Sequence, residues 1–238
     1  MTIRLLPPLV LLLAASPVLA AEEDEDDPFF GAISFGYLAT TGNTETTSLD
    51  TQAAATYRVG SWEHEAAGQA FTSSENKLTN AEYYTARWRS RWEFTERDFL
   101  FGRLNWRKDR FGAFDTQFSQ TAGYGRRLFT GPTHTLNVEV GAGLRQSEDQ
   151  LGVSTDETIL FAGLDYLWQF SETASFSQVF SIESGEDNTF FESKSSISAQ
   201  LIGALSLVGS YTIRSNSDVP VGTEKTDTQT GISLEYRF

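Results

Sequence analysis

The sequence of 238 residues contains no cysteine, two histidines and one methionine. Disulfide bonds, thiolate metal sites and a cysteine nucleophile are therefore excluded. After residue 20 there is also no run of about 20 apolar residues, which is the length that a membrane-spanning helix requires. Basic residues number 18 against 32 acidic ones, for a net charge of −14, and this sign disfavours nucleic acid as a partner.

The first 20 residues have the pattern of a cleaved secretory signal. Arg4 is followed by an apolar stretch over residues 5–15, and Val18 and Ala20 occupy the −3 and −1 positions before the cleavage point. About 11 apolar residues are too few to cross about 30 Å of hydrocarbon as a helix. We therefore predict a signal peptide over residues 1–20, whose removal takes away one arginine and changes the net charge from −14 to −15.

A short acidic segment follows the predicted signal. Six consecutive acids, Glu22 to Asp27, precede Pro28. Because like charges repel one another, we predict a solvated periplasmic tail over residues 21–28. Residues 29–238 then remain for one folded domain.

The end of the sequence alternates between side chains that suit lipid and polar side chains, and it finishes on an aromatic residue. The positions that suit lipid are Thr226, Thr228, Thr230, Ile232, Leu234, Tyr236 and Phe238. A period of two with one apolar and one polar face is that of a transmembrane β-strand. We therefore predict that residues 226–238 form the closing strand of an outer-membrane β-barrel, with Tyr236 and Phe238 as its assembly signal.

The same alternation recurs along the chain and predicts an all-β fold, a transmembrane antiparallel up-and-down barrel of about twelve strands. The expected strands are 29–40, 46–58, 62–72, 80–94, 98–108, 115–128, 133–146, 156–169, 174–184, 191–203, 205–215 and 226–238. An even number of strands returns both termini to the periplasm. A soluble β-sandwich would bury its tryptophans in a core, whereas all five tryptophans here have the parity of the lipid face.

Charged residues have the parity of the lumen on the strands expected around residues 62–108. If the connection 73–79 is symmetric, Glu65 lies opposite Arg87 and Glu63 lies opposite Arg89. The candidate lumen residues are Arg87, Arg89, Arg91, Arg103, Arg107, Glu63 and Glu65. Paired arginines and carboxylates would form a structural ladder, whereas the excess of five arginines over three glutamates, with Glu93 included, would form a cationic stripe that guides anions.

Two other patterns do not predict chemistry. Gly123, Gly125, Gly141 and Gly143 share lumen parity, but no helix follows them as a phosphate loop would require, so we expect a thin wall that makes room for arginine side chains. His64, His134 and Ser90 have the parity of the lipid face and form no readable Ser-His-Asp set. We predict no catalytic residue, no metal site and no cofactor.

Several segments resemble a known family. They are Gly42 to Arg58, Tyr83 to Arg110, Gly112 to Leu128, Val138 to Arg145 and the terminal LEYRF. Together they are similar to the salt-induced outer membrane protein family, a domain-of-unknown-function group. The resemblance implies a barrel in the cell outer membrane of a Gram-negative bacterium and a link to salt or acid stress, and it supplies no substrate or catalytic residue.

Three functions stay open on this sequence. The first is a narrow passive pore for small polar or anionic solutes, which requires an unfilled lumen. The second is a closed envelope barrel without transport, which requires saturated pairing of arginine with glutamate, and the third is a membrane hydrolase, which requires a nucleophile beside His64 or His134. In each case we expect a monomer that contacts outer-membrane lipids and lipopolysaccharide and is inserted by the barrel assembly machinery.

Overall fold

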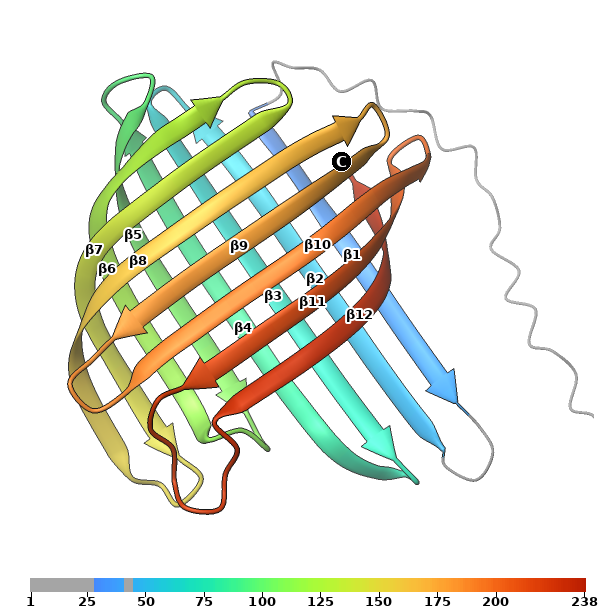
Figure 1. Ribbon diagram of the computed structural model, residues 1–238, viewed down its shortest axis with the longest axis vertical. Helices are drawn as coiled ribbons and strands as arrows, with labels where there is room; N and C mark the ends of the chain where they lie inside the picture. Colours follow the sequence, from blue (N-terminus) through green and yellow to red (C-terminus); the bar gives the residue numbers. More distant parts are fainter. Residues whose placement is uncertain (1–27, 41–44) are drawn as a thin grey trace, which may run out of the picture.

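The computed structural model describes residues 28–40 and 45–238 and forms one closed barrel of twelve antiparallel strands (Figure 1). The strands are β1 (Phe29–Thr40), β2 (Thr46–Val59), β3 (Trp62–Glu75), β4 (Leu78–Glu93), β5 (Asp98–Asp109), β6 (Phe114–Thr130), β7 (His134–Asp149), β8 (Ser154–Ser171), β9 (Ala174–Ser184), β10 (Thr189–Ile202), β11 (Leu205–Asn216) and β12 (Thr226–Arg237). The predicted twelve-strand barrel is therefore confirmed. The predicted signal peptide and nearly all of the acidic tail lie outside the described residues.

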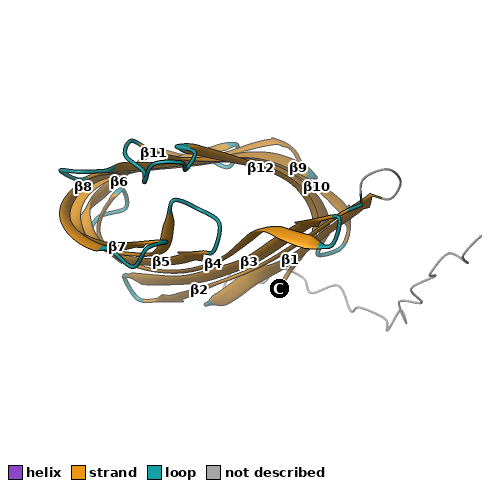
Figure 2. Cartoon of the chain, turned by 90° about the horizontal axis from the view of Figure 1, so that it is seen from below, coloured by secondary structure: helices purple, strands orange, loops and turns teal. Residues whose placement is uncertain are grey.

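Each strand pairs with its neighbours in the sequence, and β1 closes the barrel on β12. The start of β1 and the end of β12 lie at the same end, which for an even-stranded barrel is the periplasmic end. The cross-section is flattened, as seen in the view along the barrel (Figure 2). Within the described residues no helix is long and apolar enough to cross a membrane.

The outer wall carries the tryptophans and many of the other aromatic side chains. All five tryptophans are exposed, with Trp62 at 47% and Trp106 at 37% as the extremes. Near the periplasmic end, ring contacts run from Trp62 to Trp92, from Trp92 to Phe94 and from Phe94 to Tyr124, with centroids 5.9–6.5 Å apart. Amphipathic rings in this position suit the boundary between hydrocarbon and headgroups.

The register between β3 and β4 differs from the prediction by two residues. Glu65 lies opposite Arg89 and Glu63 lies opposite Arg91. The predicted partners were wrong because the connection is a tight turn at Asn76 and Lys77, both with positive φ, and an irregularity between Ser73 and Ser74 adds one residue to β4. A shift of two residues keeps every side chain on its predicted face.

Gly123 and Gly125 of β6 make room for phenylalanine rings, whereas Gly141 and Gly143 of β7 lie close against β6. A Cβ at Gly125 would lie 2.2 Å from the Phe99 ring, and one at Gly123 would lie 2.9 Å from the Phe101 ring and 2.1 Å from a backbone oxygen. Phe99 and Phe101 pack with Phe161 inside the barrel, and all three are buried. The wall is thin at these glycines, as expected. The side chains that use the space beside Gly123 and Gly125 are phenylalanines and not the predicted arginines.

The contact between β1 and β12 is the shortest of the strand pairs in the described barrel. Its register runs only from Ala32 with Arg237 to Phe35 with Leu234, whereas the other neighbouring strands pair along most of their length. Beyond this register, Phe238 and Gly31 exchange two backbone hydrogen bonds of 2.8 and 2.9 Å. The terminal residue therefore supplies a large part of this closure.

Candidate functional site in the barrel lumen

Eight charged side chains fill one half of the lumen, and we call them the ion-pair cluster. Its members are Arg58, Glu63, Glu65, Arg89, Arg91, Arg103, Glu139 and Asp165. Arg89 of β4 contacts Glu65 of β3 at 2.5 Å and Asp165 of β8 at 2.8 Å. Arg91 contacts both Asp165 and Glu139 at 3.0 Å. Because β4 and β8 are not adjacent, these pairs cross the lumen and tie opposite walls together.

Aromatic rings of β5 and β8 pack against the arginines of the ion-pair cluster. The guanidinium of Arg91 lies 4.9 Å from the centroid of the Phe99 ring, and that of Arg103 lies 4.8 Å from the Phe161 centroid. The nearest carboxylate to Arg103 is Glu139, at 3.9 Å. Arginine tolerates this setting because its flat guanidinium can stack on a ring as well as pair with an acid.

A further buried arginine, Arg145, lies at the outer end of the same half. The side chain of Arg145 is 1% exposed and lies 2.5 Å from Glu157, and it donates a hydrogen bond of 3.3 Å to the backbone oxygen of Glu183. Glu157 in turn accepts backbone hydrogen bonds from Asp187 and Asn188 at 2.8 and 2.9 Å. These contacts pin the connection between β9 and β10 to the wall of the filled half.

The cationic stripe, which was the alternative to a structural ladder, is neutralised. The ion-pair cluster contains four arginines and four carboxylates, since Glu139 of β7 and Asp165 of β8 reach across the lumen from strands that hairpin reasoning does not connect to β4. Arg87 likewise pairs with Glu192 of β10 at 3.3 Å. The count of five arginines against three glutamates was therefore incomplete, and it gives no excess charge in this half.

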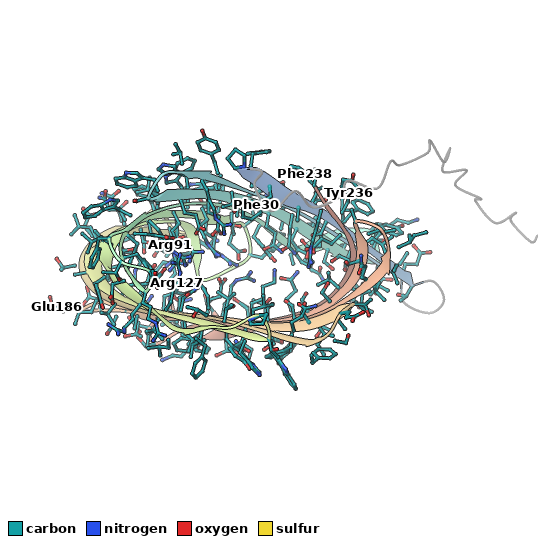
Figure 3. All side chains as sticks on the ribbon, turned by 90° about the horizontal axis from the view of Figure 1, so that it is seen from above. Phe30, Arg91, Arg127, Glu186, Tyr236 and Phe238 are labelled. Atoms are coloured by element: carbon teal, nitrogen blue, oxygen red, sulfur yellow. The ribbon has the colours of Figure 1, made fainter. Side chains whose placement is uncertain are left out.

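The opposite half of the lumen is open. Three inward-facing alanines lie side by side on β1, β2 and β3, in the order Ala32, Ala54 and Ala67. Ala54 is exposed although it faces inward. A cavity of about 230 Å³ runs along this row and is bounded on the far side by Lys194 of β10 and Arg214 of β11. In Figure 3 the labelled Arg91 and Arg127 project into the crowded half.

The predicted lumen residues divide between these two halves. Arg87 lines both the large cavity and a smaller one of about 70 Å³, and Arg103 and Arg107 line the smaller one alone. Arg107 is paired with Asp109 at 2.5 Å. The predicted residues that line neither cavity and lie within the ion-pair cluster are Glu63, Glu65, Arg89 and Arg91.

The residues weighed for hydrolysis meet on the outer wall. His64 Nδ1 lies 2.8 Å from the Ser90 hydroxyl, which also accepts a hydrogen bond of 3.0 Å from the Trp88 indole. The imidazole stacks between Trp62 and Trp88, and within the described residues no carboxylate is bonded to it. Ser90 pairs with His64 on one side and with Gly102 on the other, so it lies in the strand ladder and not in an exposed turn that could present free N–H groups to an oxyanion.

Sequence reasoning did not pair the arginines of β4 with the acids of the opposite wall, and it did not single out the lysine of the open half. Glu139 and Asp165 have inward parity on their strands, as has Lys194 on β10, so alternation could have assigned their face. Alternation does not give the distance across the lumen, because that distance depends on how the barrel is flattened.

A closed barrel with an aromatic outer wall and a charged, partly hollow interior defines the class of outer-membrane β-barrels. Residues 33–238 match the family described as "Protein of unknown function, DUF481", and the chain belongs to this family. The family resemblance inferred from the sequence is thereby confirmed.

Individual proteins and solved structures are also similar to this chain. The "Uncharacterized protein YdiY" of Escherichia coli (strain K12) is 33% identical over 210 residues, which cover 88% of this chain and 83% of the relative. An outer membrane channel from Pseudomonas putida F1 superposes with a TM-score of 0.53 at 8% identity, covering 88% of this chain and 95% of that one. The NanC porin gives a TM-score of 0.48 at 8% identity, with 87% and 97% covered. At 8% identity the likeness to the Pseudomonas putida channel shows the fold alone.

Proposed function

We propose that this protein is a narrow passive channel for small polar solutes and that the solutes pass through the open half of the lumen. The observation that carries the proposal is the cavity of about 230 Å³ beside the row of Ala32, Ala54 and Ala67. Side chains this small leave the space between opposite walls unfilled, and Gln52 and Gln69 offer hydrogen bonds along it. A polar, water-accessible lining of this kind suits hydrated solutes.

The closed structural barrel is the second candidate, and the ion-pair cluster favours it. Arg91 and Glu139 are buried and mutually paired, as a barrel braced across its lumen requires. This bracing accounts for one half of the lumen and leaves the other half open. The hydrolase has weaker support, because no acid in the described part of the chain orients the imidazole of His64 beside Ser90.

The channel is tested by narrowing the open half from the inside. We expect Ala67→Trp to reduce the single-channel conductance of the refolded protein in planar bilayers to a small fraction of the wild-type value, because the indole would project into the cavity that Ala67 lines. Ala66→Trp is the matched control, since Ala66 is exposed on the outer wall opposite Trp88. It should conduct as the wild type does.

Two results would overturn the channel. Equal conductance of both tryptophan variants would show that solutes do not pass beside β3. Folded wild-type protein without any conductance across several preparations would favour the closed barrel instead.

The cellular setting forms part of the same proposal. The chain is exported by its signal peptide, inserted into the outer membrane of a Gram-negative cell by the barrel assembly machinery, and surrounded there as a monomer by lipids and lipopolysaccharide. The link to salt or acid stress is a prediction that rests on the family resemblance.

A further inference from the structure

Lys194 is unlike the other cations inside the barrel. It projects from β10 across the lumen, and its Nζ donates a hydrogen bond of 2.8 Å to Gln52 Oε1 on β2. Among the inward-facing basic side chains of the described strands it alone has no carboxylate within 4.0 Å, whereas Arg87, Arg214 and Arg237 on the same side each have one. An ammonium carries three donors, so two donors of Lys194 stay available to a solute in the cavity.

Gln52 holds this ammonium away from the nearest acid. The amide nitrogen of Gln52 donates to Asp50 at 3.0 Å, and Asp50 also accepts from Gln69 at 2.9 Å and from Gln229 at 3.4 Å. Because the nitrogen of Gln52 faces Asp50, its oxygen faces Lys194. The three amides satisfy the carboxylate of Asp50 and leave it outside direct contact with the lysine.

Two arginines next to Lys194 share a single acid. Glu192 accepts from Arg214 at 2.7 Å and from Arg87 at 3.3 Å, and all three side chains line the same cavity as Lys194. The cavity lining thus contains three cationic groups and two carboxylates, Glu192 and Glu235, and Glu235 is paired with Arg237 at 2.9 Å. Of the five arginines in the cationic stripe considered from the sequence, only Arg87 lines this cavity.

We propose that Lys194, with Arg87 and Arg214 beside it, forms a binding site for the carboxylate of a small hydroxylated organic acid. The inference rests on the proposed channel and names the class of solute that it favours. Ser34, Thr85 and Thr212 line the cavity and supply hydroxyl partners. The lining contains no aromatic residue, so a ligand gains no ring stacking and is held by charge and hydrogen bonds.

The site is tested with gluconate as the probe and sorbitol as its uncharged counterpart. Titration calorimetry on the full chain in detergent measures binding without any need for conduction. We expect wild-type protein to bind gluconate and not sorbitol, and Lys194→Gln to weaken the binding about tenfold, since one charge-assisted contact is lost. Lys194→Arg should restore most of it.

Lys108→Gln is the matched control, because Lys108 pairs with Asp115 and lines neither cavity. It removes the same charge and should leave the binding of gluconate unchanged. The proposed site would be overturned if both variants lost gluconate affinity equally, or if Lys194→Gln bound gluconate as tightly as the wild type. Binding of sorbitol as tight as that of gluconate would also overturn it.

Conductance recorded on the same preparations separates the two proposals. Binding of gluconate by a barrel that conducts nothing supports the site and rejects the channel. If the protein conducts but does not bind gluconate, and gluconate does not reduce the conductance, the channel is supported and the binding site is rejected.

Discussion

Both halves of the lumen contain basic and acidic side chains, and yet one half is filled and the other is open. In the filled half, Arg91 is 5% exposed and meets acids from three other strands. In the open half, Lys194 meets one amide oxygen from the opposite wall. The difference lies in the residues between the charges, which are Phe99 and Phe161 on one side and alanines on the other.

This comparison shows that side-chain volume, and not the charge pattern, decides where a barrel of this size stays open. Gly123 and Gly125 on β6 let the rings of Phe101 and Phe99 approach the wall closely, and Phe99 in turn covers the guanidinium of Arg91. Pairing inside such a low-dielectric region is stronger than pairing in water, but each charge must then keep its partner. The filled half therefore stabilises the barrel, and the open half is free to bind solutes.

The largest effect is expected at the closure beside the open half. Deleting Phe238 removes two backbone hydrogen bonds to Gly31 and the ring contact with Phe29 at 6.1 Å between centroids, at a seam whose register spans only four residue pairs. We expect most of the protein to fail to assemble. The measurement is the fraction that migrates as the compact, heat-modifiable form in unheated gels of outer membranes.

Phe238→Tyr is the control for this deletion. It keeps the ring and the position of the carboxylate, and it should assemble normally. Wild-type amounts of compact barrel in the deletion strain would contradict the role of the terminal residue.

Breaking the filled half should have the next largest effect. Arg91→Ala leaves Glu63 and Glu139 buried without one of their partners, and removing one member of a buried ion pair costs about 3–5 kcal/mol of unfolding free energy. Arg58→Ala is the matched control because Arg58 contacts the same Glu63 at 3.0 Å from a side chain that is 61% exposed. Its expected cost is below about 1 kcal/mol.

Urea unfolding of the two variants in lipid vesicles measures both numbers. A similar small loss in each would mean that water reaches Arg91 and that the filled half is not dry. A large loss only at Arg91 would sharpen the comparison between the two halves.

Alternation along the strands was sufficient to predict the barrel and the face of each residue, because covalent geometry fixes a period of two. It could not give the partners. The pairing of Glu65 with Arg89 depends on a tight turn and an irregularity at Ser73, and the contact between Arg89 and Asp165 depends on how the closed barrel flattens. Phe99 has the same parity as Arg103 on β5, so its position inside the barrel could have been predicted from the sequence.

The smallest effect concerns the glycines under the phenylalanine rings. In Gly125→Ala the new Cβ would lie 2.2 Å from the Phe99 ring, so the ring must move away from Arg91, and overpacking of this kind costs about 1–3 kcal/mol. Gly102→Ala is the control, since a Cβ there meets no atom within 4 Å; it should change the unfolding free energy by less than about 0.5 kcal/mol.

Shortening the ring tests the cause of that loss. In the double variant Gly125→Ala with Phe99→Leu, the branched side chain has room beside the new methyl group, so the double variant should be less destabilised than the sum of the two single variants. Urea unfolding midpoints of the four proteins measure this coupling. Strict additivity would mean that the glycine is required for the bend of β6 and not for the ring, and the filled half would then be explained by backbone shape instead of side-chain volume.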